Sequence, residues 1–293
     1  MIYDHIVDKR QLRQAFERAA ASYDQSAVLQ REVCERMLSR LDYIKHNPDN
    51  VLDMGSGTGY GSRKLIERYP RSQLLAVDIA HAMHLQARPA LPRRKQWLFF
   101  AKRPNTHYLG GDIEHLPLQD ACVDMIWSNL TIQWCNDLKQ TFAETFRVLK
   151  SGGLLMFSTF GPDTLKELKQ AFRAVDRYSH INRFTDMHDI GDLLVHSGFA
   201  TPVMDMEYIT LTYDDVMAIM RDLKAIGAHN VTAGRHRGLT GKSGWQRVIE
   251  HYESLRHAGK LPATFEVVYG HAWKPEPRQV SLKPETRQKL GLE

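Results

Sequence analysis

The sequence predicts an α/β fold, in which a mostly parallel sheet carries helices on both faces. Short apolar runs alternate with helical segments from residue 51 to residue 160. Two of these runs end in an aspartate, and four glycines follow the first run within seven residues. Parallel strands need crossover connections, so this alternation is typical of a doubly wound sheet. Ligands of such sheets bind at the carboxyl ends of the strands.

The first elements follow in order from the N-terminus. Residues 8–41 predict helix because they hold no Gly or Pro and many strong helix formers, with a break near Ser22–Asp24. The run VLDM is a short buried strand that leads into the glycines. The helix GSRKLIERY then ends at Pro70, and QLLAVDI forms a second strand.

The second half predicts one more strand–helix–strand unit and then a mainly helical region. VDMIWSN is a strand, DLKQTFAETFRVLK is a helix capped by Gly152–Gly153, and LLMFSTF is the next strand. Beyond Gly161, helices are expected over 162–178, 184–199 and 212–226. Gly198 is the C′ residue of the second, and Thr212 with Asp215 has capping-box spacing in the third. TFEVVYGHAW is a late strand.

The composition limits the class of protein. With 43% hydrophobic and 25% charged residues in 293, the chain is an ordinary globular protein. The N-terminus has no apolar signal-like region, and no apolar run approaches the ~20 residues of a membrane span. Three cysteines without a CxxC pair argue against a disulfide framework. These features predict a cytoplasmic protein without a membrane span.

The net charge of +5 comes from one segment. Residues 88–107 carry six Lys and Arg residues and no acid, so the rest of the chain has a net charge of −1. A general affinity for nucleic acid is therefore not expected. Aromatic residues lie within this basic insertion, 88–106. Three roles therefore stay open for it: binding RNA, binding an anionic membrane surface, or serving as an accessory docking surface.

Glycines at a strand-to-helix turn let a ligand approach the backbone closely. The turn lacks the Lys and Ser/Thr of a Walker A loop. Gly57, Gly59 and Ser62 nearly satisfy the dinucleotide spacing, but Asp53 precedes the first glycine and gives D-x-G-x-G-x-G. A tight turn without a ligand is the alternative.

Two later acids favour a nucleoside without a diphosphate. Asp78 closes the second strand, where a carboxylate can accept both ribose hydroxyls. Asp112, in GGDIEHLP, is placed to meet an adenine amino group. A cationic sulfonium would tolerate nearby acids, as a diphosphate would not.

The stretches VLDMGSGTG, LLAVDIA, GDIEHLP, WSNLTIQW and FRVLKSGGLLMFSTF resemble the successive motifs of class I S-adenosylmethionine-dependent methyltransferases. The resemblance implies a Rossmann-like fold, a seven-stranded mostly parallel sheet with an antiparallel last strand, for which TFEVVYG is the candidate. It also implies S-adenosylmethionine as the cofactor. By the motif match, the cofactor-binding residues would be Asp53, Gly55, Ser56, Gly57, Gly59, Asp78, Ile79, Asp112, Ile113, Ser128 and Asn129.

A narrower resemblance covers most of the chain. AFERAAASYDQSAVLQ, SNLTIQWCNDL, HINRF and MRDLKAIGAHNVTAGRHRGLTGKSGWQRV resemble malonyl-[acyl-carrier protein] O-methyltransferases of biotin synthesis. The basic insertion and the last twenty or so residues lie outside it. The resemblance implies methylation of the free malonyl carboxylate, held by a phosphopantetheine arm on an acidic acyl-carrier protein. A carboxylate of pKa near ~4 is already a nucleophile, so no general base is expected.

Positioning and exclusion of water should then supply the rate, because opposite charges disappear in the reaction. Tyr23 is the expected lid residue over the cofactor, and Gln133 and Trp134 would wall the methyl site. A partly buried helix tyrosine and a core tryptophan are the alternatives. The substrate-binding candidates are cations: Arg18 and Arg183 for the malonyl group, and Arg235, Arg237, Lys242 and Arg247 for the carrier.

The expected organisation is a helical lid over residues 1–45, a methyltransferase domain over 46–273 and a loosely held tail over 274–293. Acceptor-side helices are expected over 162–230. No metal site is expected, because His81 and His84 lack a third ligand. Two rival functions remain: another S-adenosylmethionine enzyme of this fold (a small-acid or quinone-precursor methyltransferase, or an arginine hydroxylase-like assembly factor), and a non-catalytic RNA-binding module.

Overall fold

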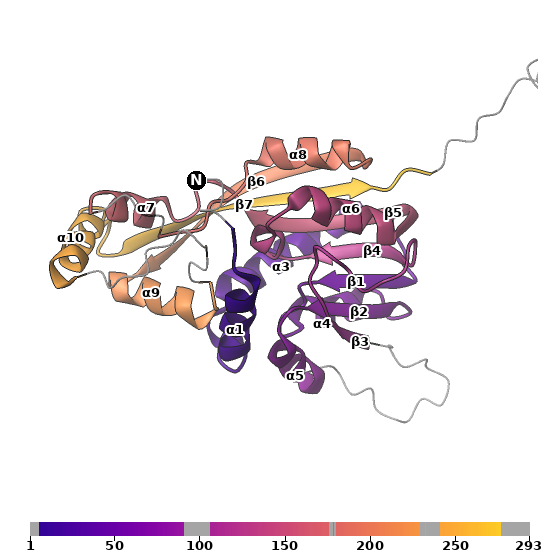
Figure 1. Cartoon of the computed structure of the whole chain (residues 1–293), viewed down its shortest axis with the longest axis horizontal. Coiled ribbons are helices and arrows are strands. Elements are labelled where there is room, and N and C mark those ends of the chain that lie inside the picture. The colour runs from indigo at the N-terminus through magenta and orange to yellow at the C-terminus, as the bar shows by residue number, and fades with distance from the viewer. Residues whose placement is uncertain are drawn as a thin grey trace, which may run out of the picture.

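The computed structural model describes residues 6–90, 106–175, 178, 180–228, 232 and 241–276. A seven-stranded sheet forms its centre, with helices on both faces (Figure 1). The strands are β1 (Asn50–Met54), β2 (Gln73–Asp78), β3 (Thr106–Gly110), β4 (Val123–Ser128), β5 (Leu149–Phe160), β6 (Ala200–Tyr213) and β7 (Leu261–Trp273). The predicted fold class is confirmed.

The strand order is β3-β2-β1-β4-β5-β7-β6. The chain therefore reverses direction across the sheet between β1 and β4, and the carboxyl ends of both strands border the crevice formed there. Strand β7 is antiparallel to β5 and to β6, whereas the other neighbouring strands pair in parallel. The late strand expected from TFEVVYG is thus the antiparallel one.

Helices α3 (Val28–Arg40) and α4 (Tyr60–Arg68) cover one face of the sheet. Their apolar side chains share a core with Val51, Met125 and Trp127. On the other face, α6 (Leu138–Val148) and α8 (Met187–His196) pack against a second core. The central strands are buried on both faces, which explains why they are apolar runs without alternation.

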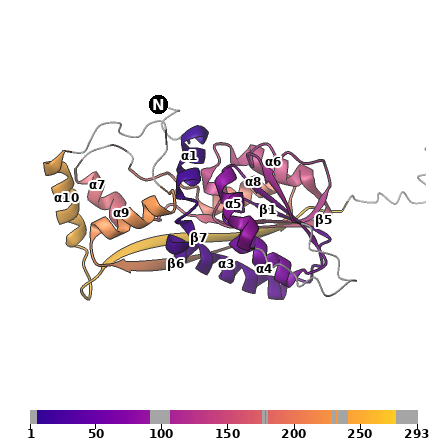
Figure 2. The ribbon, with the colours of Figure 1, turned by 90° about the horizontal axis from the view of Figure 1, so that it is seen from below.

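A separate lobe forms at one end of the molecule. Strands β6 and β7 extend beyond the rest of the sheet, and α7 (Lys166–Arg173), α9 (Val216–Ala225) and α10 (Lys242–Glu253) gather on this extension (Figure 1). Figure 2 shows these three helices on one side of the two strands. The rings of Phe172 and Trp245, tilted by 47° with centroids 6.2 Å apart, join α7 to α10.

The N-terminal segment forms α1 (Lys9–Ala19), α2 (Tyr23–Ser26) and α3, followed by a short 3-10 turn at Leu41–Tyr43. The expected break lies at residues 20–22, between α1 and α2. Asp8 begins α1 by accepting hydrogen bonds from the backbone of Arg10 and Gln11. Helix α1 stands between the lobe and the sheet (Figure 2).

Two capping predictions are wrong. Gly152–Gly153 do not end α6, because that helix ends at Val148 and β5 begins at the next residue. Thr212 does not take part in a capping box, because it lies in β6. Asp215 alone begins α9, by accepting a hydrogen bond from the backbone of Ala218. By contrast, Gly198 follows α8 with φ +92°, as predicted for a C′ glycine.

The sequence interpretation missed β6 entirely. From Glu207 to Tyr213 its residues alternate between half-buried and exposed, so only one face of the strand packs. The span 162–230, expected to hold acceptor-side helices, therefore also contains a strand and α8, which packs on the sheet. The final tail after residue 276 and most of the basic insertion, 91–105, lie outside the described residues.

Candidate functional site

The glycine turn after β1 is held against the end of β2. The backbone N–H groups of Gly55 and Ser56 both donate to the carbonyl of Val77, at 2.8 and 3.0 Å. Gly55 has φ +79°, and a Cβ there would lie 2.2 Å from the side chain of Thr131. A residue other than glycine would therefore be both strained and obstructed. Gly55 and Gly57 of this turn line a cavity at the carboxyl ends of the strands.

Asp78 ends β2 beside this turn. One of its carboxylate oxygens accepts from the backbone N–H of Gly57 and the other from that of Ala80, each at 2.8 Å. Burial raises the pKa of Asp78 to about 6, against these hydrogen bonds. An ionised carboxylate can accept about four hydrogen bonds, so Asp78 retains the capacity to accept from a further donor.

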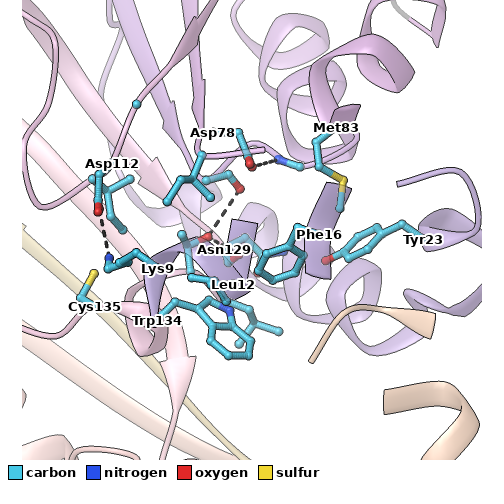
Figure 3. Close-up of a pocket in the computed structure, with 17 residues that line it drawn as sticks. Lys9, Leu12, Phe16, Tyr23, Asp78, Met83, Asp112, Asn129, Trp134 and Cys135 are labelled. Carbon is cyan, nitrogen blue, oxygen red and sulfur yellow. Dashed lines mark hydrogen bonds and ion pairs between the residues drawn. The ribbon is translucent and has the colours of Figure 1, made fainter. Parts of the chain in front are cut away.

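These residues border a cavity at the ends of the strands, which we name the strand-end cleft. Ile79, Asp112, Ile113 and Asn129 also line it (Figure 3). Asp112 follows β3 and accepts a hydrogen bond from Lys9 Nζ at 3.0 Å. The structure therefore brings together acids from the ends of two neighbouring strands, as the sequence predicted. The complete described lining is Lys9, Leu12, Phe16, Tyr23, Gly55, Gly57, Asp78, Ile79, Met83, Gly111, Asp112, Ile113, Asn129, Leu130, Thr131, Trp134 and Cys135.

Asp53 lies behind the turn, in a smaller hollow that it shares with Ser56 and Trp127. Its carboxylate accepts from Ser62 Oγ at 2.5 Å. Burial is the main reason why the pKa of Asp53 is raised to about 7, although this hydrogen bond opposes the shift. The indole Nε1 of Trp127 is buried without a hydrogen-bond partner among the described residues.

Three other predicted cofactor-binding residues have different positions. Asn129 lines both the cleft and the smaller hollow. Ser128 is fully buried, donates to the carbonyl of Met54 at 3.0 Å and lines neither space. Gly59 precedes α4 with φ +78°, outside both linings. A Cβ on Gly59 would lie 2.9 Å from Ala87, so this glycine permits close packing of α5 (His81–Ala90).

The N-terminal helices cover the cleft and contact all four strand ends around it. Besides the Lys9–Asp112 pair, the Glu17 carboxylate accepts from the backbone of His81 and Ala82, at 2.8 and 2.9 Å, at the start of α5. Asp24 accepts a hydrogen bond from Thr58 Oγ1 in the glycine turn, and the Gln30 carbonyl accepts from Asn129 Nδ2 at 2.9 Å. We call helices α1 to α3, which make these contacts, the lid.

Tyr23 and Trp134 both face the cleft (Figure 3). Burial, with the carboxylates of Asp78 and Asp24, raises the pKa of the Tyr23 phenol above its usual range. The Trp134 indole is 9% exposed and meets the ring of Phe16 edge-on, with centroids 5.6 Å apart. Gln133 does not line this cleft, nor the second cavity described in the next paragraph. Its amide donates to the Leu130 carbonyl at 2.7 Å and accepts from Thr159.

A second cavity, which we name the lobe chamber, lies between the lid and the lobe. Its volume is about 550 Å³. Trp134 belongs to the linings of both the cleft and the chamber, so the two spaces share this wall. The described lining is mainly apolar: Arg18, Gln30, Trp134, Phe160, Thr164, Leu165, Leu168, Phe172, His180, Ile181, Asn182, Phe184, Met220, Leu223, Lys224, Ile226, Ala228 and Phe265.

Comparison with known proteins decides the family. Residues 52–157 match the family described as a methyltransferase domain. The chain is 68% identical to the malonyl-[acyl-carrier protein] O-methyltransferase of Nitrosospira multiformis, over 99% of this chain and 97% of the relative. The chain belongs to the malonyl-[acyl-carrier protein] O-methyltransferase family. The family member of Gallionella capsiferriformans is 62% identical, over 94% of each chain.

Solved structures agree on the fold of this family member. A Bacillus halodurans protein whose crystal structure is described as that of a methyltransferase superposes with a TM-score of 0.58. It covers 83% of this chain and 99% of its own, at 15% identity, so the likeness concerns the fold alone. Together with the matching domain, it identifies the Rossmann-like class I methyltransferase fold.

The predicted substrate cations of this methyltransferase separate into four groups. Arg18 lines the lobe chamber, as does Lys224, which the sequence interpretation missed. Arg183 lies between two residues of the chamber lining, but its own side chain is exposed and outside that lining. Lys242 and Arg247 are exposed on α10. Arg235 and Arg237 lie outside the described residues.

Other residues at the two cavities also escaped prediction, chiefly Lys9, Phe16 and Gln30. The only signal for them was that Leu12 and Phe16 share one face of a helix, at i and i+4. Within the part of the chain that the structure describes, no group of three or more His, Cys, Asp or Glu residues could hold a metal ion. In the same part, no helix has the length and apolar character needed to cross a membrane.

Proposed function

We propose that the protein transfers a methyl group from S-adenosylmethionine to the free carboxylate of malonyl-acyl-carrier protein. The observation that carries this proposal is the 68% identity to a malonyl-[acyl-carrier protein] O-methyltransferase over nearly the whole of both chains. That match includes the lid and the lobe, which lie outside the matched methyltransferase domain at residues 52–157.

The strand-end cleft fits S-adenosylmethionine in the chemistry of its donor and acceptor groups. Asp78, with its unused acceptor capacity, would hold the two ribose hydroxyls. Asp112 and Ile113 would hold the adenine, through the carboxylate and the apolar side chain respectively. Gly55, Gly57 and Asn129 would line the methionine part. When bound, the cofactor supplies an electrophilic methyl group on a sulfonium.

The acceptor carboxylate needs no activation by the protein. Its pKa near ~4 leaves it ionised at neutral pH, so no residue has to remove a proton. Tyr23 could not do so in any case, because its raised pKa keeps the phenol protonated. The residues of the site are therefore proposed to bind and orient the two groups, and the ring of Tyr23 to cover the cleft.

Exclusion of water is the second contribution that we assign to the chain. The negative carboxylate and the positive sulfonium lose their charges together, so a site that is poor in water favours the reaction over bulk solvent. Leu12, Phe16 and Trp134 supply apolar walls between the cleft and the lobe. The lid contacts keep these walls in place. Arg18, at the chamber, is the proposed partner of the malonyl carboxylate.

The test is the intact mass of malonyl-acyl-carrier protein after incubation with S-adenosylmethionine and the enzyme. We expect the mass to rise by that of one CH2 unit, because a methyl group replaces the acid proton. Acetyl-acyl-carrier protein is the matched control, because it lacks only the free carboxylate. The proposal fails if the malonyl carrier gains no methyl group although calorimetry shows that the enzyme binds S-adenosylmethionine.

A further inference from the structure

The lobe chamber is larger than its proposed substrate group requires. A malonyl group has three carbon atoms, whereas the chamber has a volume of about 550 Å³, within the range of ligand pockets. Aromatic side chains make up much of its wall: Phe184 packs on Phe160 with ring centroids 5.6 Å apart, and His180 stacks on Phe172 at 3.9 Å. Its occupant therefore has a long and mainly apolar body.

Asn182 and Thr164 are buried polar residues of this wall, and Asn182 differs from Thr164 in having an unpaired oxygen. Asn182 lies in the loop before α8, between Ile181 and the exposed Arg183, and is 7% exposed. Its side-chain oxygen has no hydrogen-bond partner among the described residues. A buried amide oxygen without a partner is costly, so a native structure retains one only where something else satisfies it.

Gln30 presents the same feature nearer to the cleft. Its backbone carbonyl is fixed by the hydrogen bond from Asn129 Nδ2 at 2.9 Å. Its side chain lines both the lobe chamber and the hollow beside Asp53. The side-chain oxygen is buried, again without a partner in the described parts of the chain. Two residues of the chamber lining thus have unpaired acceptor oxygens, in mainly apolar surroundings that also include the cations Arg18 and Lys224.

Apart from Arg18 and Lys224, this pattern suits a ligand with an uncharged body that carries N–H donors along an apolar chain. A simple acyl chain has no donors, and the several charges of a nucleotide would have to lie against mainly apolar walls. Pantetheine has methylene and methyl groups interrupted by two secondary amides, each with one N–H donor. The chamber is lined from the lobe helices to the shared wall at Trp134, so an arm lying in it would point toward the cleft.

We propose that the lobe chamber binds the pantetheine arm of the acceptor, and that Asn182 and Gln30 accept hydrogen bonds from its two amide N–H groups. This inference rests on the proposed function for the identity of the acceptor. It adds the site of the arm and two positioning residues, which would hold the thioester end at a fixed distance from the cleft.

The experiment compares the KM values of two substrates in the wild type and in a variant with one apolar substitution. Malonyl-pantetheine carries both amides, whereas the malonyl thioester of hexanethiol carries none. Asn182→Leu keeps the approximate volume of the side chain and removes the acceptor. We expect it to raise KM about tenfold for malonyl-pantetheine and less than about twofold for the hexanethiol thioester. Asn182→Asp, which keeps the acceptor oxygens, should recover part of the loss.

A binding measurement makes the test independent of methyl transfer. Pantetheine itself is titrated into the protein with S-adenosylhomocysteine present, and tryptophan fluorescence reports binding through Trp134 at the shared wall. The wild type should bind, and Asn182→Leu should weaken the affinity about tenfold. Gln30→Met, at the other acceptor, should act in the same direction and serves if the first variant does not fold.

The outcomes separate this inference from the proposed function. Equal losses for both thioesters, or pantetheine binding that neither substitution weakens, would overturn the assignment of the chamber even if malonyl-carrier protein is methylated. Conversely, pantetheine binding that depends on Asn182 and Gln30, without methylation of the malonyl carrier, would support the chamber and refute the proposed acceptor.

Discussion

Lys9 Nζ lies 3.0 Å from the Asp112 carboxylate, although 103 residues separate them in the sequence. The same ammonium also pairs with Glu114. This contact joins the first helix to the loop after β3, while Glu17, Asp24 and Gln30 join the lid to the loops after β2, β1 and β4. The position of the lid is thus coupled to the shape of the strand-end cleft.

Removing the Lys9 ammonium should loosen this coupling. Lys9→Met leaves the Glu114 carboxylate, which is mostly buried, without its cation. We expect the free energy of unfolding to fall by about 1–2 kcal/mol in urea denaturation. Bound S-adenosylmethionine should also dissociate faster in stopped-flow fluorescence. Lys45→Met, at an exposed position, is the control. If both variants have the same stability and dissociation rate, the contact does not hold the lid.

Asp78 should account for much of the cofactor affinity. Asp78→Ala removes the acceptor that we assign to the ribose hydroxyls, so the binding free energy of S-adenosylmethionine should weaken by about 1–3 kcal/mol. Isothermal titration calorimetry measures this change directly. An unchanged affinity would refute the placement of the ribose at the end of β2.

The same carboxylate predicts a pH dependence of binding. The pKa of Asp78 in the free protein is raised to about 6, and only the ionised form accepts from both hydroxyls. Affinity should therefore be constant above pH 7 and fall by up to about tenfold for each pH unit below 6. Asp78→Asn should lack this slope. A slope centred near pH 7 would instead point to Asp53, whose pKa is about 7.

Tyr23 should act through its ring. Its raised pKa excludes a role as a base, so Tyr23→Phe should retain kcat within about fivefold, and the pH profile should keep its shape. Tyr23→Ala opens the lid side of the cleft to water and should lower kcat further. Steady-state kinetics with malonyl-pantetheine measure both effects. A loss in Tyr23→Phe as large as that in Tyr23→Ala would show that the hydroxyl is required.

The exposed cations of α10 should contribute to binding of the carrier protein and not to binding of the pantetheine arm. Lys242→Glu combined with Arg247→Glu should raise KM for malonyl-acyl-carrier protein about tenfold, most strongly at low salt, and leave KM for malonyl-pantetheine unchanged. Lys139→Glu on α6, which covers the other face of the sheet, is the matched control. If the α10 double variant and Lys139→Glu raise KM for the carrier substrate equally, α10 is not the docking surface.

Local signals predicted the centre of the fold well. Each strand from β1 to β5 except β3 contains a short apolar run, and Asp53, Asp78 and Asp112 lie at or just after strand ends. The topology of a parallel sheet then brings these ends together, which is why Asp78 and Asp112 line one cleft.

The errors occurred where contacts between distant segments decide the structure. Strand β6 is stabilised by pairing with β7, some fifty residues later, and Thr212 therefore joins a strand although its spacing to Asp215 suits a helix start. Gln133 lies beside Trp134 in the sequence, but its amide is bound to Leu130 and Thr159. The contacts of Lys9, and the unpaired oxygens of Gln30 and Asn182, have no local signature at all.

A crystal structure with S-adenosylhomocysteine and a stable malonyl-pantetheine analogue would show where both substrates bind. We expect the ribose to lie against Asp78, the arm to fill the lobe chamber beside Asn182, and the carboxylate to meet the cofactor sulfur at the wall formed by Trp134. A nucleoside bound away from the glycine turn, or an arm that leaves the chamber empty, would contradict the central claim that the two cavities hold the two substrates.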